Sequence, residues 1–169
     1  MRTQGSIAGL ATLALLLVAY ESPGSAQQLD NKMNDVADQL RTQLAGEPVT
    51  VRQLGPVTLT SGADAMFPSG GWELKPGVPV LNKIVPTLSK LQHTEIVVGG
   101  YTDNTPIGAP LQGAGISNNL DLSCKRAASV VVYLVSKGVN PNLWSAQCFG
   151  RRDPLHRTTR PRKRRRIGA

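Results

Sequence analysis

An apolar stretch, a polar loop and a long amphipathic stretch follow one another, and this succession restricts the fold most. Residues 95–100 (E-I-V-V-G-G) have the apolar, β-rich composition of a buried strand. Residues 122–137 carry apolar side chains at helical spacing on one face, and Gly138 follows as a typical C-terminal stop. Because a strand and a helix with apolar faces bury those faces against each other, the segment predicts one β–loop–α unit of a layered domain.

Further strands and helices are predicted on both sides of this unit. Residues 49–60 are β-rich and alternate apolar with polar side chains, as half-buried strands do. Residues 76–91 predict a helix that Pro86 should kink, and residues 143–149 are a last strand candidate. The order β–α–β–α–β predicts an α+β sandwich whose helices pack on one face of a small mixed sheet.

Residues 27–45 predict a helix with a single apolar stripe. The stripe consists of Leu29, Met33, Val36, Leu40 and Leu44. These residues recur at steps of three and four, the spacing of one helix face. Two interpretations stay open, because the stripe can pack on its own domain or form a short coiled-coil spacer or dimer seam.

Residues 1–26 predict a secretory signal peptide. Arg2 supplies a positive start, residues 7–20 form a largely apolar run, and Gly24 and Ala26 fit cleavage after Ala26. The run has 14 residues, fewer than the roughly 20 that a membrane-spanning helix needs. An uncleaved membrane anchor is the alternative, and only then is a membrane partner expected.

The basic charge of the chain is confined to its end. The chain has 169 residues with 19 Lys and Arg against 11 Asp and Glu, and nine of the basic and one of the acidic residues lie at 151–169. The first 150 residues are therefore neutral, so bulk positive charge does not drive their binding. Residues 151–169 are expected to form a disordered tail, for which binding to nucleic acid or an anionic membrane is the alternative.

The sequence contains no recognisable catalytic or metal-binding constellation. Its histidines, His93 and His156, and its cysteines, Cys124 and Cys148, lack the spacing of a zinc site. No phosphate-loop pattern is present. We therefore expect no enzyme activity, no cofactor and no metal. Two cysteines of an exported chain can pair, but their contexts do not indicate a selected disulfide, and the pairing stays open.

Opposite charges flank the polar loop between the central strand and the long helix. The strand runs into Thr102 and Asp103, and residues 119–123 (N-L-D-L-S) open the helix that carries Arg126. Free N–H groups at a helix start and a guanidinium attract a carboxylate, whereas Asp103 suits an ammonium. Together they predict a site for a zwitterion such as an amino-acid head group. The alternative is that Asp103 pairs with Arg126 or caps a turn.

Four segments resemble the OmpA-like (OmpA/MotB C-terminal) peptidoglycan-binding domain. They are F-P-S-G-G-W-E-L (67–74), V-V-G-G-Y-T-D-N-T-P (97–106), N-L-D-L-S-C-K-R-A-A-S-V (119–130) and G-V-N-P-N-L-W-S-A-Q-C-F-G (138–150). The resemblance implies a periplasmic domain that holds the meso-diaminopimelate of a peptidoglycan stem peptide without covalent chemistry. It implies that Asp103 and Arg126 hold the head group of this ligand. The secondary binding positions that it implies are Thr102, Asn119, Leu122 and Ser123.

The chain departs from the family pattern at three places. Tyr101 stands where the family usually has histidine, and Cys148 stands at a glycine position whose loss is costly if the backbone needs a positive φ. After the position of Gly150, members of the family continue with a sequence similar to G-E-T-R-P-V-A and then with a closing strand. When codons are chosen to encode such a family-like sequence and one base is deleted after the glycine codon, the shifted reading frame encodes residues 150–161 of this chain. We therefore predict a frameshifted or degenerate C-terminus, a missing closing strand, an open sheet edge and lowered stability.

These patterns predict four regions. They are a signal peptide (1–26), an N-terminal helix and linker (27–56), an OmpA-like domain (57–150) and the tail (151–169). The predicted function is non-catalytic binding of peptidoglycan, which anchors the protein to the cell wall in the periplasm, with or without a membrane or outer-membrane association. The alternatives are polyanion binding through the tail and a non-functional degenerate copy. No nucleic-acid partner is expected, and the N-terminal helix is the candidate for a dimer contact.

Overall fold

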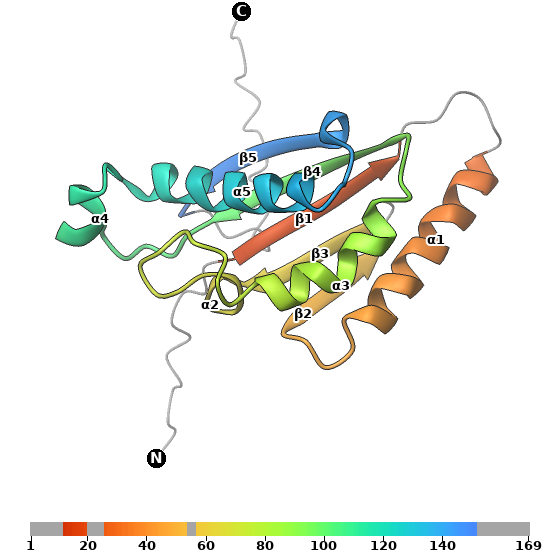
Figure 1. Cartoon of the computed structure of the whole chain (residues 1–169), viewed down its shortest axis with the longest axis horizontal. Helices are drawn as coiled ribbons and strands as arrows, with labels where there is room; N and C mark the ends of the chain where they lie inside the picture. The colour runs from red at the N-terminus through yellow and green to blue at the C-terminus, as the bar shows by residue number, and fades with distance from the viewer. Residues whose placement is uncertain (1–11, 20–25, 54–56, 152–169) are drawn as a thin grey trace, which may run out of the picture.

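The computed structural model describes residues 12–19, 26–53 and 57–151. These residues form a five-stranded sheet in the order β2-β3-β1-β4-β5, with helices packed on it (Figure 1). The strands are β1 (Thr12–Ala19), β2 (Val49–Gln53), β3 (Val57–Gly62), β4 (Thr94–Tyr101) and β5 (Trp144–Gly150). The helices are α1 (Ala26–Gln43), α2 (Ala63–Met66), α3 (Val78–Leu88), α4 (Ala109–Gly113) and α5 (Asn119–Ser136), and a 3-10 turn, η1 (Pro141–Leu143), precedes β5.

The sheet is mixed. β1 runs antiparallel to both β3 and β4, β2 pairs antiparallel with β3, and β5 lies parallel to β4. The connection between the parallel strands β4 and β5 contains α5, as a parallel crossover requires. The predicted α+β class, with helices on one face of a small mixed sheet, is confirmed.

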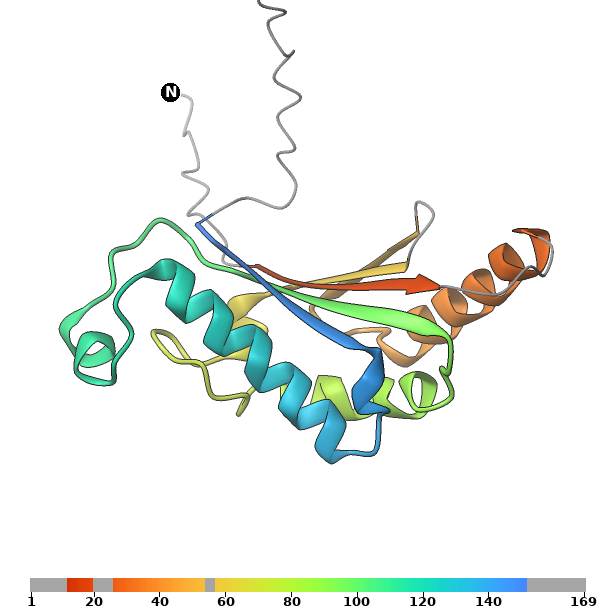
Figure 2. The same cartoon turned by 90° about the horizontal axis from the view of Figure 1, so that it is seen from above.

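The core lies between the sheet and helices α3 and α5, which Figure 2 shows on the same side of the sheet. Alternate residues of β3 and β4 point into this layer, so Val57, Ile96 and Val98 are fully buried. The helix predicted at residues 76–91 is α3, which ends at Leu88, the second residue after Pro86. The helix predicted at residues 122–137 is α5, which begins three residues earlier, at Asn119.

The apolar stripe of the N-terminal helix belongs to the same core. Met33, Leu40 and Leu44 are buried there together with other members of the core cluster. Two hydrogen bonds fasten the end of this helix and the turn after it to α3. Thr87 Oγ1 donates to Gln43 Oε1, the last residue of α1, over 3.0 Å, and Lys83 Nζ donates to Glu47 Oε1 in the turn over 2.6 Å. The stripe therefore packs on its own domain, and a dimer contact through this helix stays a prediction.

The segment predicted as a signal peptide contains a strand of the sheet. Thr12–Ala19 is β1, between β3 and β4. Residues 1–11 and 20–25 lie outside the described residues, and cleavage after Ala26 stays a prediction. The tail from residue 152 onward also lies outside them, so the frameshift and its missing closing strand stay predictions. The outer strands of the described sheet are β2 and β5.

Among the described residues, no helix is both long and apolar enough to cross a bilayer.

Candidate ligand-binding site

A pocket of about 490 Å³ opens where the end of β4, the start of α5 and the turn after α2 meet. Its lining includes Asp64, Thr102, Asp103, Asn119, Leu122 and Arg126. Five of these six residues were predicted from the sequence as one site, and the structure brings these five together. Ser123, the remaining predicted residue, does not line the pocket. That any of them binds a ligand stays a prediction.

A close contact between β4 and α5 positions the two sides of the pocket. A Cβ added at Gly100 would overlap the carbonyl oxygen of Ser123 and lie 2.9 Å from its carbonyl carbon, so this approach requires glycine. The fully buried Ser123 hydroxyl donates to the Leu120 carbonyl over 2.7 Å and accepts from the Gly150 N–H over 3.1 Å. Ser123 thus joins α5 to the end of β5 behind the pocket.

The start of α5 is closed by polar side chains. Asn118 is its N-cap residue, and its Oδ1 accepts from the N–H groups of Leu120 and Asp121 over 2.9 and 3.0 Å. Asn119 donates from Nδ2 to the carbonyls of Asp103 and Thr105 over 3.2 and 3.1 Å. The helix start therefore holds the loop that carries Asp103.

Asn118→Ala should lower the free energy of unfolding by about 1 kcal/mol, because two helix N–H groups lose their acceptor. Urea denaturation of the full chain measures this loss. Asn118→Asp is the matched control, since a carboxylate oxygen can accept the same hydrogen bonds and should keep the midpoint near that of the unchanged protein. An alanine variant as stable as the aspartate variant would contradict the cap.

Asp103 and Thr102 present free hydrogen-bonding atoms at the pocket. Asp103 is half-buried, and its Oδ1 accepts from the Thr105 N–H over 3.0 Å, while no described residue bonds to its Oδ2. Thr102 is buried, and its Oγ1 has no hydrogen-bond partner among the described residues. Because a buried hydroxyl without a partner costs free energy, a ligand or a water molecule that bonds to it would be favoured.

Arg126 brings a buried positive charge to the other wall. Its side chain is 6% exposed, its Nε donates to the Gly71 carbonyl over 2.9 Å, and its guanidinium lies 5.2 Å from the centroid of the Phe67 ring. Burial lowers the pKa of Arg126, whereas the negative charges of Asp103 and Asp64 raise it. A negatively charged ligand here would offset the cost of burying the cation.

Arg126 and Asp103 do not pair directly. Within the described part of the chain, no carboxylate lies within 4 Å of the Arg126 guanidinium. Asp103 does cap a turn through its bond to Thr105, as one of the alternatives held. Its second oxygen and the guanidinium therefore keep their capacity for a partner from outside.

The segment after β3 contributes to the pocket in a way that the sequence did not predict. Asp64 lines the pocket, and its negative charge raises the pKa of Arg126. Phe67 and Gly71 contact the Arg126 side chain. The motif F-P-S-G-G at 67–71 was the available signal, but Gly71 lies 55 positions before Arg126 in the chain. Spacing along the sequence does not indicate such a contact.

The position that departs from the family histidine lies outside the pocket. The Tyr101 ring stacks on the Phe149 ring with centroids 4.6 Å apart, and both rings lie against Gly99. Burial raises the pKa of Tyr101. Tyr101 is not among the pocket-lining residues.

A disulfide joins α5 to β5. Cys124 and Cys148 are bonded, with their Cα atoms 4.9 Å apart. The sequence had left this pairing open. The positive φ considered for Cys148 does not occur, because every described residue with a positive φ is a glycine, Gly150 with φ +59° among them. The cost that a positive φ would impose at position 148 therefore does not arise.

Curated proteins with related sequences are named as outer membrane proteins. Outer membrane protein A of Klebsiella aerogenes is 39% identical over 101 residues, which are 58% of this chain and 27% of that protein. Outer membrane protein P5 of Haemophilus influenzae is 33% identical over 99 residues, which are 58% of this chain and 26% of that protein. The chain thus spans about a quarter of the length of these curated relatives.

Two solved structures share the fold. A MotB-like protein from Desulfovibrio vulgaris superposes with a TM-score of 0.67 at 24% identity, over 76% of this chain and 84% of that chain. The cell wall anchor of the T6SS from Pseudomonas aeruginosa superposes with a TM-score of 0.60 at 24% identity, over 71% of this chain and 82% of that chain. The sequence model of the OmpA family matches residues 66–168, which make up more than half of the chain. The chain therefore belongs to the OmpA family.

Proposed function

We propose that this protein binds peptidoglycan without covalent chemistry and so anchors to the cell wall. The observation that carries the proposal is the pair of opposite charges, Asp103 and Arg126, on the walls of one pocket without an ion pair between them. Membership of the OmpA family and the fold shared with a cell wall anchor support it.

The ligand we infer is the head group of diaminopimelate in a stem peptide, where an ammonium and a carboxylate sit on one carbon. The ligand carboxylate faces Arg126, whose guanidinium can donate two parallel hydrogen bonds to it. The ammonium faces the free Oδ2 of Asp103, and the Thr102 hydroxyl accepts or donates a further hydrogen bond. The carboxylate and the ammonium of the ligand thus each face a protein side chain of opposite charge.

This function involves binding only, so the proposal gives the chain no catalytic step and no cofactor. Within the described residues no cluster of three potential metal ligands occurs. We propose that the protein lies in the cell envelope and faces the periplasm; the names of the curated relatives, which are outer membrane proteins, support the envelope. Polyanion binding through the basic tail stays a separate prediction on residues outside the described part.

Asp103→Asn should weaken binding to sacculi about 30-fold or more, because loss of one partner of a desolvated charge pair typically costs ~2–5 kcal/mol. The substitution removes the charge but keeps an oxygen that can accept from the Thr105 N–H. Co-sedimentation of the full chain with purified sacculi that contain diaminopimelate measures the effect.

Asp38→Asn is the matched control for this experiment. Asp38 lies on α1, is paired with Arg41 over 2.6 Å, and does not line the site pocket. We expect it to sediment like the unchanged protein. Arg126→Lys should weaken binding about tenfold, since lysine keeps the charge but not the planar fork. Equal sedimentation of the Asp103, Arg126 and Asp38 variants, all of them folded, would refute the proposed site.

A further inference from the structure

The strand β1 connects two parts of the sheet that do not otherwise pair. On one side its residues run from Thr12 opposite Gly62 to Leu17 opposite Val57. On the other side they run from Leu13 opposite Gly100 to Ala19 opposite Thr94. In the strand order, β3 and β4 are neighbours of β1 and not of each other. The backbone bonds of β1 therefore hold the β2–β3 hairpin and the β4–β5 pair in one sheet.

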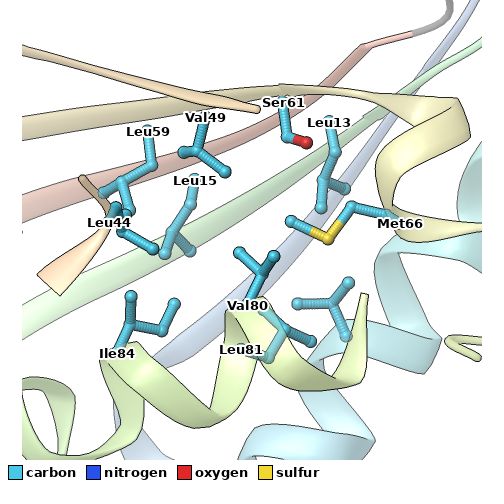
Figure 3. A pocket seen from close by; sticks show the side chains of 11 residues that line it. Leu13, Leu15, Leu44, Val49, Leu59, Ser61, Met66, Val80, Leu81 and Ile84 are labelled. Atoms are coloured by element: carbon cyan, nitrogen blue, oxygen red, sulfur yellow. The ribbon is translucent and has the colours of Figure 1, made fainter. Parts of the chain in front are cut away.

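The side chains of β1 alternate between two environments. Leu13, Leu15 and Leu17 are buried, the last of them completely, whereas Ala14 and Leu16 are only half-buried. Figure 3 shows Leu13 and Leu15 directed toward Val80, Leu81 and Ile84 of α3. These residues line a cavity of about 20 Å³. This is the pattern of a strand that covers the core with one face.

Removal of β1 would leave a slot between β3 and β4. The backbone N–H and C=O groups of both strands would lose their partners along this slot. The core would lose three leucines, and the fully buried Val57 and Ile96 would lose the strand beside them. Cleavage after Ala26 would therefore remove the central strand of the described sheet.

We propose that Thr12–Ala19 stays in the folded protein as its central strand, and that β3 and β4 form a strand-binding slot which this segment fills within its own chain. The slot takes an extended segment that is antiparallel to both neighbours and apolar at alternate positions on the core side. This inference goes beyond the proposed function and does not depend on it, because no step of it involves the ligand pocket.

Two substitutions in β1 test whether the strand belongs to the folded state. Leu17→Asp places a carboxylate at a fully buried position, whereas Leu16→Asp places one on the half-buried face of the same strand. We expect Leu17→Asp to lower the melting midpoint by about 10 °C or more, or to abolish cooperative melting, and Leu16→Asp to shift it by a few degrees. If the segment lies outside the folded state, the two variants melt at the same temperature.

Cutting the chain tests the occupant of the slot even if Leu17→Asp fails to fold. A site for a specific protease is placed at residues 20–25 of the full chain, the folded protein is cut, and the products pass through size-exclusion chromatography. We expect the N-terminal fragment to co-elute with the body at the mass of one chain, with cooperative melting retained. Release of the fragment with an unchanged melting midpoint overturns the proposal.

The protein isolated from cells gives an independent answer. Mass spectrometry of the folded form should find residues 12–19 in the chain. A form that begins at Gln27 and melts cooperatively overturns the proposal.

Discussion

Gly100→Ala is expected to lower the free energy of unfolding by about 3 kcal/mol, the upper part of the usual range for an overpacked core position. The added methyl group would meet the Ser123 carbonyl, which belongs to the backbone of α5. Backbone cannot rotate away as a flexible side chain can, so β4 and α5 must separate. The same separation moves Asp103 away from Arg126, and we expect ligand binding to weaken as well. Urea denaturation of the full chain measures the first effect.

Gly62→Ala is the matched control for Gly100→Ala. Gly62 is also a strand residue of the same sheet, and a Cβ there would have no atom within 4 Å. We expect the Gly62 variant to differ from the unchanged protein by less than about 0.5 kcal/mol, as substitutions without such contacts do. Equal midpoints for the two variants would show that the approach of β4 to α5 is not as close as described.

Loss of the disulfide is expected to cost about 3 kcal/mol of stability, or roughly 10 °C in melting midpoint. Cys124 and Cys148 lie 24 positions apart, so the bond closes a loop of moderate length and restricts the unfolded chain. It also holds α5, which carries Arg126, on β5. Thermal melts of the full chain with and without a reducing agent measure the effect.

The double variant Cys124→Ser with Cys148→Ser separates the bond from other effects of reduction. Its melting midpoint should lie near that of the reduced protein and should not change when the reducing agent is added. An unchanged protein whose midpoint is insensitive to reduction, under conditions where both thiols are shown to be free, would contradict a stabilising bond.

The long helix and the strand before it could be predicted because their patterns are strong and local. The apolar pattern of the helix begins only at Leu122, three residues after the start of α5, whereas the motif at 119–123 marks that start. The five pocket residues that were predicted together come from the ends of these two elements.

Three features could not be predicted from the sequence, for different physical reasons. In β1 the half-buried positions are apolar as well, so no alternation separates a strand from an export signal. Asp64 and Gly71 reach the neighbourhood of Arg126 through a contact between distant parts of the chain. The disulfide requires that α5 and β5 pack against each other where Cys124 and Cys148 lie. The spacing of the two cysteines in the sequence does not indicate this packing.

Calorimetric titration of the full chain with two stem tripeptides tests the central claim, that Asp103 and Arg126 together select a zwitterionic head group. One tripeptide ends in meso-diaminopimelate, and the other has lysine in its place, which keeps the side-chain ammonium and lacks the carboxylate beside it. The account predicts binding of the diaminopimelate peptide, at least tenfold weaker binding of the lysine peptide, and loss of this preference in Arg126→Lys. Equal affinity of the unchanged protein for both peptides would contradict the account.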